Sequence, residues 1–188
     1  KKEFPIRDEK WNRFVSVRQI KESVPANLGR SRNTMESPSE GQIEVRESIR
    51  VQAMLAAIGT QMGLSIWLPT GDRQRVMRVL DQPIELIESL QVVLELNAET
   101  MRTIQEIDVL WLRGDNQIVN AFEVEHTTSI YSGILRMADL LALVPNLNFQ
   151  LRLVAPDERR EDVLKQIRRP VFEVMKGGSL AQKCTFIP

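Results

Sequence analysis

The stretch Ala121–Thr128, AFEVEHTT, places two carboxylates at alternate positions in a run that otherwise reads as a buried strand. Side chains on a strand alternate between its two faces, so Glu123 and Glu125 share one face. A buried unpaired charge is costly, and a folded protein keeps such a group in water or gives it a partner. The pattern therefore predicts either the exposed polar face of an edge hairpin or a site that uses both acids.

A second strand-like run lies just upstream and carries Glu106 and Asp108 on one face. We join the two runs as a hairpin with a four-residue loop, 114–117, which is a common length. This register places Asp108 opposite Glu123 and Glu106 opposite Glu125. Opposed residues have Cβ atoms about 5 Å apart, so like charges there repel and need a cation. Oxygen ligands of this kind suit a hard ion such as Mg²⁺, which uses few protein carboxylates.

The sequence offers few alternatives to an oxygen-ligand site. His126 is the only histidine and Cys184 the only cysteine, and they lie far apart in the chain, which argues against zinc. No nucleophile elbow accompanies His126, so we expect a structural or surface histidine there. A lone cysteine also means that disulfides do not hold the fold, which fits a cytoplasmic protein.

Capping signals, periodicity and turn residues predict the order helix, strand, strand, strand, helix, strand, helix. This order is typical of an α/β domain with a central mixed sheet flanked by helices. We expect an N-terminal extension over 1–36 and one domain over 37–188. The predicted elements are a helix from about 37 to 62, strands over 65–69, 106–112 and 118–125, a helix from 127 or 128 to about 144, a strand over 149–154 and a helix over 156–168, with a further helix over 83–95.

The first predicted helix adds another acid. Glu47 lies on the same stripe as the apolar residues of this helix, so it is either in solvent at the helix end or pointed at the site. Glu44 is the alternative. The predicted apolar stripe consists of Val51, Met54, Leu55, Ile58 and Met62.

The segments Ile107–Val109 and Phe122–Glu125 resemble the core motif of the PD-(D/E)XK nuclease superfamily, which includes restriction endonucleases and Holliday-junction resolvases. The resemblance covers about residues 44–172. It implies a restriction endonuclease-like core of the order αβββαβ. It also implies a metal-dependent endonuclease that hydrolyses DNA phosphodiester bonds.

The resemblance assigns roles to single residues. It implies that Asp108 and Glu123 bind Mg²⁺ or Mn²⁺ and that Glu47 is the first-helix acid. The usual proline before the aspartate is Ile107, and the usual lysine is Glu125. Glutamate at this place could act as a general base or hold a second metal ion, and it could equally signal a lost activity.

Basic residues supply candidate contacts to DNA phosphates. Arg136 lies on the polar face of the helix after the motif, near Glu125 in sequence, although most such faces are simply solvated. Arg168 and Arg169 belong to a basic cluster that neighbouring acids dilute, for which a salt-bridged surface helix is the alternative.

Composition narrows the function classes. The 25 basic and 25 acidic residues cancel, so a nucleic acid must be held by a local patch. No apolar run reaches the length of a membrane span, and no signal peptide is visible. The chain opens at Lys1 and not at a methionine, which leaves room for an upstream segment.

Two hypotheses therefore stand, a metal-dependent deoxyribonuclease and an inactive nucleic-acid-binding or assembly module that retains the nuclease fold. The expected partner is DNA, with a homodimer as a candidate assembly. The sequence does not distinguish DNA from RNA or indicate which site is recognised.

Overall fold

The computed structural model describes residues 40–114, 116–126, 131–144 and 147–188. The predicted extension over 1–36 and the predicted start of a helix at residue 127 or 128 lie outside these residues. The described elements are α1 (Glu40–Gln61), β1 (Ser65–Trp67), α2 (Thr70–Met77), α3 (Leu90–Val93), α4 (Ala98–Gln105), β2 (Val109–Arg113), β3 (Gln117–Val124), α5 (Tyr131–Leu143), β4 (Gln150–Val154), η3 (Asp157–Arg159), α6 (Arg160–Ile167), α7 (Pro170–Glu173), α8 (Leu180–Lys183) and β5 (Cys184–Ile187).

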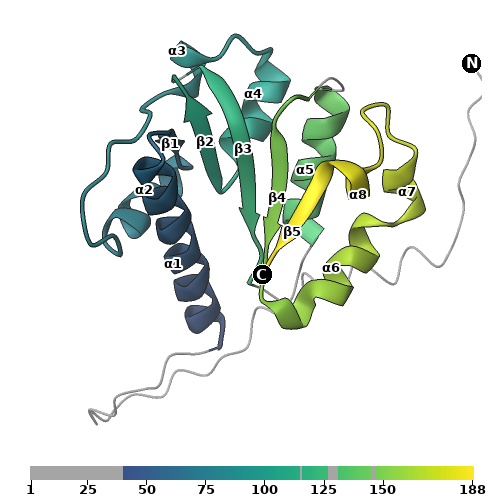
Figure 1. The fold of residues 1–188 in the computed structure, drawn as a ribbon, viewed down its shortest axis with the longest axis horizontal. Helices are drawn as coiled ribbons and strands as arrows, with labels where there is room; N and C mark the ends of the chain where they lie inside the picture. Colours follow the sequence, from purple (N-terminus) through teal and green to yellow (C-terminus); the bar gives the residue numbers. More distant parts are fainter. Residues whose placement is uncertain (1–39, 115, 127–130, 145–146) are drawn as a thin grey trace, which may run out of the picture. The chain divides into compact units, whose positions relative to one another are not determined.

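The five strands form one mixed sheet in the order β1-β2-β3-β4-β5. The pairs β1–β2 and β2–β3 are antiparallel, whereas β3–β4 and β4–β5 are parallel. Figure 1 shows α1 and α2 beside β1 and β2, with α5 to α8 beside β4 and β5. The predicted α/β class, with a mixed sheet flanked by helices, is confirmed, and the architecture is consistent with a restriction endonuclease-like core. In the described residues, no helix combines the length and the apolar character needed to cross a membrane.

Two apolar clusters cover the two faces of the sheet. One joins α1 and α2 to the strand residues Val109, Trp111, Phe122 and Val124. The other joins α4, α5, α6 and α8 to residues such as Leu110 on the opposite face. Successive residues of β2 therefore alternate between the clusters, as the strand period requires, and β3 does so from Ala121 to Phe122.

The face with which α1 packs differs from the predicted apolar stripe. Met54, Ile58 and Met62 are exposed, and over the part of the helix whose side chains are described, 47–61, the buried residues are Ile49, Gln52, Ala53, Leu55, Ala56 and Gly59. The reason is the bulk of the sheet below it, where the indole Nε1 of Trp111 donates to the carbonyl of Leu55 at 3.1 Å. A Cβ on Gly59 would lie 2.6 Å from that same nitrogen, so the helix needs small residues here.

The predicted hairpin register is correct at the end near the acids and wrong at the turn. Val109 pairs with Phe122, and continuing this register by one residue places Asp108 opposite Glu123, as predicted. At the turn, Arg113 pairs with Gln117 and not with Ile118. A β-bulge between Trp111 and Leu112 makes up the difference, because it inserts one extra residue into a strand.

Three other expectations are corrected by the structure. Strand β2 begins at Val109, so Glu106 ends helix α4 as an exposed residue and does not belong to the carboxylate patch. Helices α2 and α4 lie in segments for which no element was predicted, and only the short α3 falls within the predicted helix over 83–95. Strand β5 was not predicted at all.

Candidate active site

Three acids meet where β2 begins and β3 ends. Asp108 directly precedes β2, Glu123 is the second-last residue of β3, and Glu125 follows that strand. Antiparallel pairing brings the start of one strand beside the end of the other. The glutamates are 0% and 4% exposed, and both face α5, so they are not an exposed polar edge.

Asp108 is tied to the neighbouring strand. Its Oδ2 accepts the backbone N–H of Val124 at 2.7 Å. Burial raises the pKa of Asp108 to about 6, although the Val124 hydrogen bond and Arg136 oppose the shift. The charges of Asp72 and Glu125 raise this pKa further. The carboxyl is therefore held close to acidic neighbours with little water around it.

Glu123 is paired with an arginine of α5. Arg136 Nε donates to Glu123 Oε1 at 2.8 Å, and Arg136 Nη2 donates to Glu123 Oε2. Burial nevertheless raises the pKa of Glu123, and the charges of Asp108 and Glu125 add to the effect against Arg136. Pairing with Glu123 raises the pKa of Arg136, which stays charged. The charge of Arg136 thus acts on all three carboxyl groups.

Glu125 is held by the first turn of α5. Its Oε1 accepts the backbone N–H of Gly133 at 2.7 Å and the hydroxyl of Ser132 at 3.5 Å. Burial raises the pKa of Glu125, whereas the Gly133 and Ser132 hydrogen bonds and the charges of Arg136 and Arg159 lower it. A Cβ on Gly133 would collide with Glu125 Oε1 and lie 3.0 Å from Glu123 Oε2. The glycine therefore lets α5 approach both acids.

Two charged residues near the acids were not assigned to the site from the sequence. Asp72 is in the first turn of α2, in a segment for which no helix or strand was predicted, and its charge acts on Asp108. Arg159 ends η3, and its charge acts on Glu125. Strands β3 and β4 are parallel, so the segment that follows β4 reaches the same edge of the sheet as Glu125. Only that long-range pairing reveals Arg159.

The structure describes the surroundings of the remaining sequence candidates. Glu47 is on α1 and pairs with Arg50 at 2.6 Å on an exposed surface of that helix. Arg168 and Arg169 are exposed at the junction of α6 and α7, about 12 Å along α6 from Arg159. His126 is partly buried beside Glu125. Roles for Glu47, Arg168 and Arg169 stay predictions.

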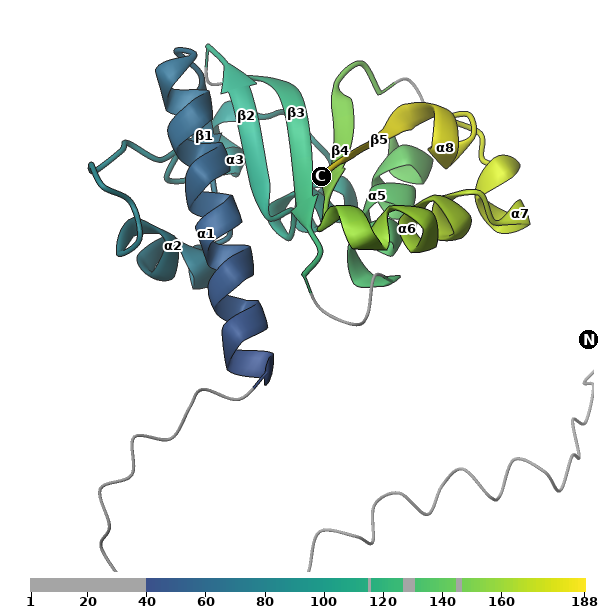
Figure 2. The ribbon, with the colours of Figure 1, turned by 60° about the horizontal axis from the view of Figure 1, so that its bottom comes forward.

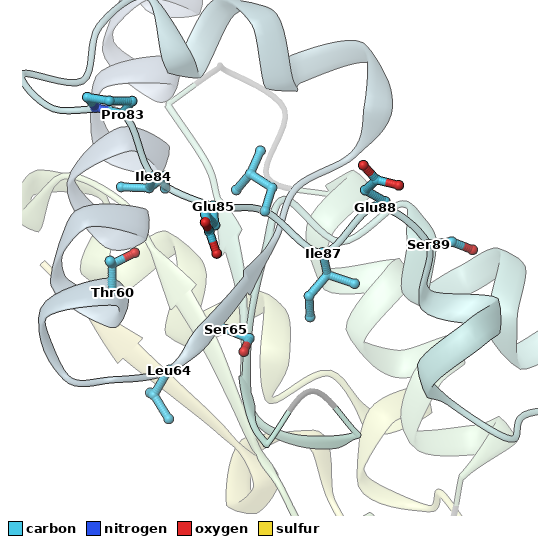
Figure 3. Close-up of a pocket in the computed structure, with 10 residues that line it drawn as sticks. Thr60, Leu64, Ser65, Pro83, Ile84, Glu85, Ile87, Glu88 and Ser89 are labelled. Atoms are coloured by element: carbon cyan, nitrogen blue, oxygen red, sulfur yellow. The ribbon is translucent and has the colours of Figure 1, made fainter.

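A pocket of about 720 Å³ lies at the other end of the sheet. Figure 3 shows it between Thr60, Leu64 and Ser65 on one side and the segment Pro83–Ser89 on the other. Ser65 pairs with Leu112, at the far end of β2 from Asp108. The pocket is therefore separate from the carboxylates.

The acids are not arranged as a ready-made metal cage. Across the described ranges, no group of three or more His, Cys, Asp or Glu side chains could hold a metal ion. Mg²⁺ is still compatible with these acids, because proteins typically hold this ion through one or two carboxylates and several waters.

Comparison with known proteins gives two matches. A family model described as the type II restriction enzyme NmeDI C-terminal domain matches residues 25–188. The type II restriction enzyme NmeDI of Neisseria meningitidis serogroup C is 32% identical over an alignment of 142 residues, and the alignment covers 72% of this chain and 40% of that enzyme. The chain thus spans well under half the length of this curated relative. No solved structure matches the chain.

Proposed function

Because the chain belongs to the family of the type II restriction enzyme NmeDI C-terminal domain, we propose that it is the catalytic domain of a DNA endonuclease that uses a divalent metal ion. The observation that carries this proposal is the meeting of Asp108, Glu123 and Glu125 beside Arg136. Buried acids that raise one another's pKa are a costly arrangement for structure alone and are typical of functional sites.

The donor set fits a hard cation such as Mg²⁺ or Mn²⁺. All three acids offer oxygen atoms, and burial raises the pKa of each one in spite of the nearby charge of Arg136. Asp108 and Glu123 would hold the ion, with Glu47 as a further candidate ligand. When bound, the ion would withdraw charge from the scissile phosphate and lower the pKa of a water molecule.

The chain's own residues would supply the rest of the chemistry. Glu125 has Oε1 fixed by Gly133, so Oε2 is the oxygen that would take a proton from the attacking water. A buried glutamate with a raised pKa is suited to that role, because a general base works best with a pKa near the working pH. Arg136, Arg168 and Arg169 are the proposed contacts to DNA phosphates.

Cleavage assays on Glu125→Gln test the proposal. The full chain is incubated with Mg²⁺ or Mn²⁺ and a mixture of duplex, single-stranded and branched DNA of varied sequence. We expect Glu125→Gln to slow cleavage by roughly 10²–10⁴-fold, because it keeps the shape and removes the base. Asp108→Asn should abolish cleavage as well, and both variants should still bind DNA.

Glu106→Gln is the matched control. It makes the same change only two residues from Asp108, on a side chain that is exposed at the end of α4. Cleavage by this variant should equal that of the unmodified chain. If Glu125→Gln cuts DNA at the unmodified rate, Glu125 is not the base.

A second candidate function is an inactive DNA-binding module. Two observations favour it, since Glu125 stands where the resembled superfamily has lysine and Glu123 is already neutralised by Arg136. In that case the unmodified chain cuts no DNA with either metal ion but still retards it in gels. That combination of results would replace the nuclease proposal.

A further inference from the structure

Arg136 covers Glu123, the acid of the site that has no exposure to solvent. Both oxygens of Glu123 accept hydrogen bonds from the same guanidinium, and Glu123 is 0% exposed. The Arg136 side chain is 30% exposed, so its outer side reaches solvent. The arginine is therefore the group that lies between Glu123 and water on this side of the site.

A hydrated metal ion and this guanidinium compete for the same carboxylate. An ion that coordinates a Glu123 oxygen must come within about 2–2.5 Å of it, where the arginine now donates. A divalent and a monovalent cation at such close range repel strongly in a site with little water. Binding of one cation thus excludes the present position of the other.

The two glutamates are held by different kinds of group. Glu125 is fixed by the backbone amide of Gly133, which can move only with the whole of α5. Glu123 is fixed by the flexible side chain of Arg136, three residues further along the same helix. Rotation of that one side chain would open Glu123 while leaving the helix, Gly133 and Glu125 in place.

We propose that Arg136 is a resident counter-ion that Glu123 exchanges for a divalent metal ion, and that the released guanidinium turns outward to receive a DNA phosphate. The inference rests on the proposed function, since it requires metal binding at Asp108 and Glu123. It assigns two successive partners to one arginine. It also explains how the fully buried Glu123 is tolerated in the metal-free protein.

Mn²⁺ binding to Arg136→Met tests the exchange without any cleavage assay. Isothermal titration should give a dissociation constant about ten- to a hundredfold lower for Arg136→Met than for the unmodified chain, because the ion no longer has to break two charged hydrogen bonds. In EDTA the variant should melt at a lower temperature, since Glu123 is left buried and unpaired. Mn²⁺ should then raise its melting temperature by more than it raises that of the unmodified chain.

Two control variants accompany this measurement. Arg102→Met makes the same substitution at an exposed position of α4, where the side chain bonds only within its helix in the described contacts, and should leave Mn²⁺ affinity unchanged. Glu123→Gln in the Arg136→Met background should remove the binding. If binding survives that double change, the ion sits elsewhere and the exchange is wrong.

A measurement on the unmodified chain covers the case in which Arg136→Met does not fold. In nitrogen-15-labelled protein, the Nε–H signal of Arg136 should be protected from solvent exchange without metal and should lose that protection as Mg²⁺ is added. If Mg²⁺ binds in an Asp108-dependent way and the signal stays protected, the exchange fails but the proposed function stands. If neither Mg²⁺ nor Mn²⁺ binds to any form, the metal-dependent function itself fails.

Discussion

Gly133 illustrates how a single atom sets the geometry of the site. In an ordinary helix, replacing glycine with alanine stabilises by about 0.5–1 kcal/mol. Here an added Cβ meets Glu125 Oε1 and lies 3.1 Å from the Cβ of Glu123. We expect Gly133→Ala to destabilise the fold by roughly 1–3 kcal/mol, as overpacking does, in urea unfolding. Gly71→Ala is the control, because nothing lies within 4 Å of its added Cβ, and it should be neutral or stabilising.

The buried acids also predict an unusual dependence of stability on pH. The pKa of Asp108 is about 6 in the folded chain against 3.8 for the ordinary group, so the folded state binds more protons between these values. Stability from this group is fully present below about pH 4 and is lost as the pH rises through about 6. Glu123, whose pKa is also raised, extends the loss to higher pH.

Urea unfolding in EDTA at pH 5 and pH 8 measures this effect. The free energy of unfolding should fall between the two, with roughly 1.4 kcal/mol from Asp108, because only the part of its pKa shift that lies above pH 5 acts in this range. Asp108→Asn removes that titration and should flatten the pH profile relative to the unmodified chain. Identical profiles for the two proteins would show that Asp108 does not titrate in this range.

At the scale of elements, the polar residue that α1 buries against the sheet over 47–61 is Gln52, whereas the sequence indicated Glu47 as the site residue of this helix. Gln52 is 4% exposed, and among the described residues its Oε1 has no hydrogen-bond partner. Helix α1 runs in the direction of β2 (Figure 2), and Gly59 lies over Trp111. Gln52 lies seven residues before Gly59 in the helix, and Asp108 lies three residues before Trp111 of the strand. Each of these separations is about 10 Å, so Gln52 is at the level of Asp108.

We expect the amide of Gln52 to be used by the site. Gln52→Leu should stabilise the metal-free fold by about 1 kcal/mol, because a buried amide oxygen without a hydrogen-bond partner is costly. It should also lower DNA cleavage by more than Glu47→Gln does, since Glu47 pairs with Arg50 on an exposed surface. Thermal melts and cleavage rates of the two variants decide between these residues, and equal loss of cleavage would return Glu47 to the site.

The elements that the sequence predicted well are those with strong local signals. Alternation in β3 placed Glu123 and Glu125 on one face, and hairpin pairing placed Asp108 opposite Glu123. Helix α4 carried a recognisable signal that was missed, because Asn97 accepts the amide protons of Glu99 and Thr100 as a helix cap. Strand β5 has only four residues, and its parallel pairing with β4 spans about thirty residues of chain, so no local pattern marks it.

At the scale of the whole molecule, the site combines what sequence reveals with what only the fold reveals. The three acids come from one hairpin and could be predicted. Asp72 and Arg159 reach them from α2 and from the segment after β4, through packing and parallel pairing that a local pattern does not encode. The packing face of α1 was predicted wrongly for a similar reason. The bulky side chain of Trp111 lies below the helix and favours small residues over large apolar ones.

The bulge between Trp111 and Leu112 bears on how this hairpin can change during evolution. On the turn side of the bulge, Arg113 pairs with Gln117. On the side of the acids, Val109 pairs with Phe122 in a register shifted by one residue. An insertion or deletion in the turn can be taken up at the bulge without shifting the paired run from Val109 to Trp111. The tip of the hairpin is therefore free to drift in length among related proteins, whereas the spacing from the bulge to Asp108 and Glu123 is under constraint.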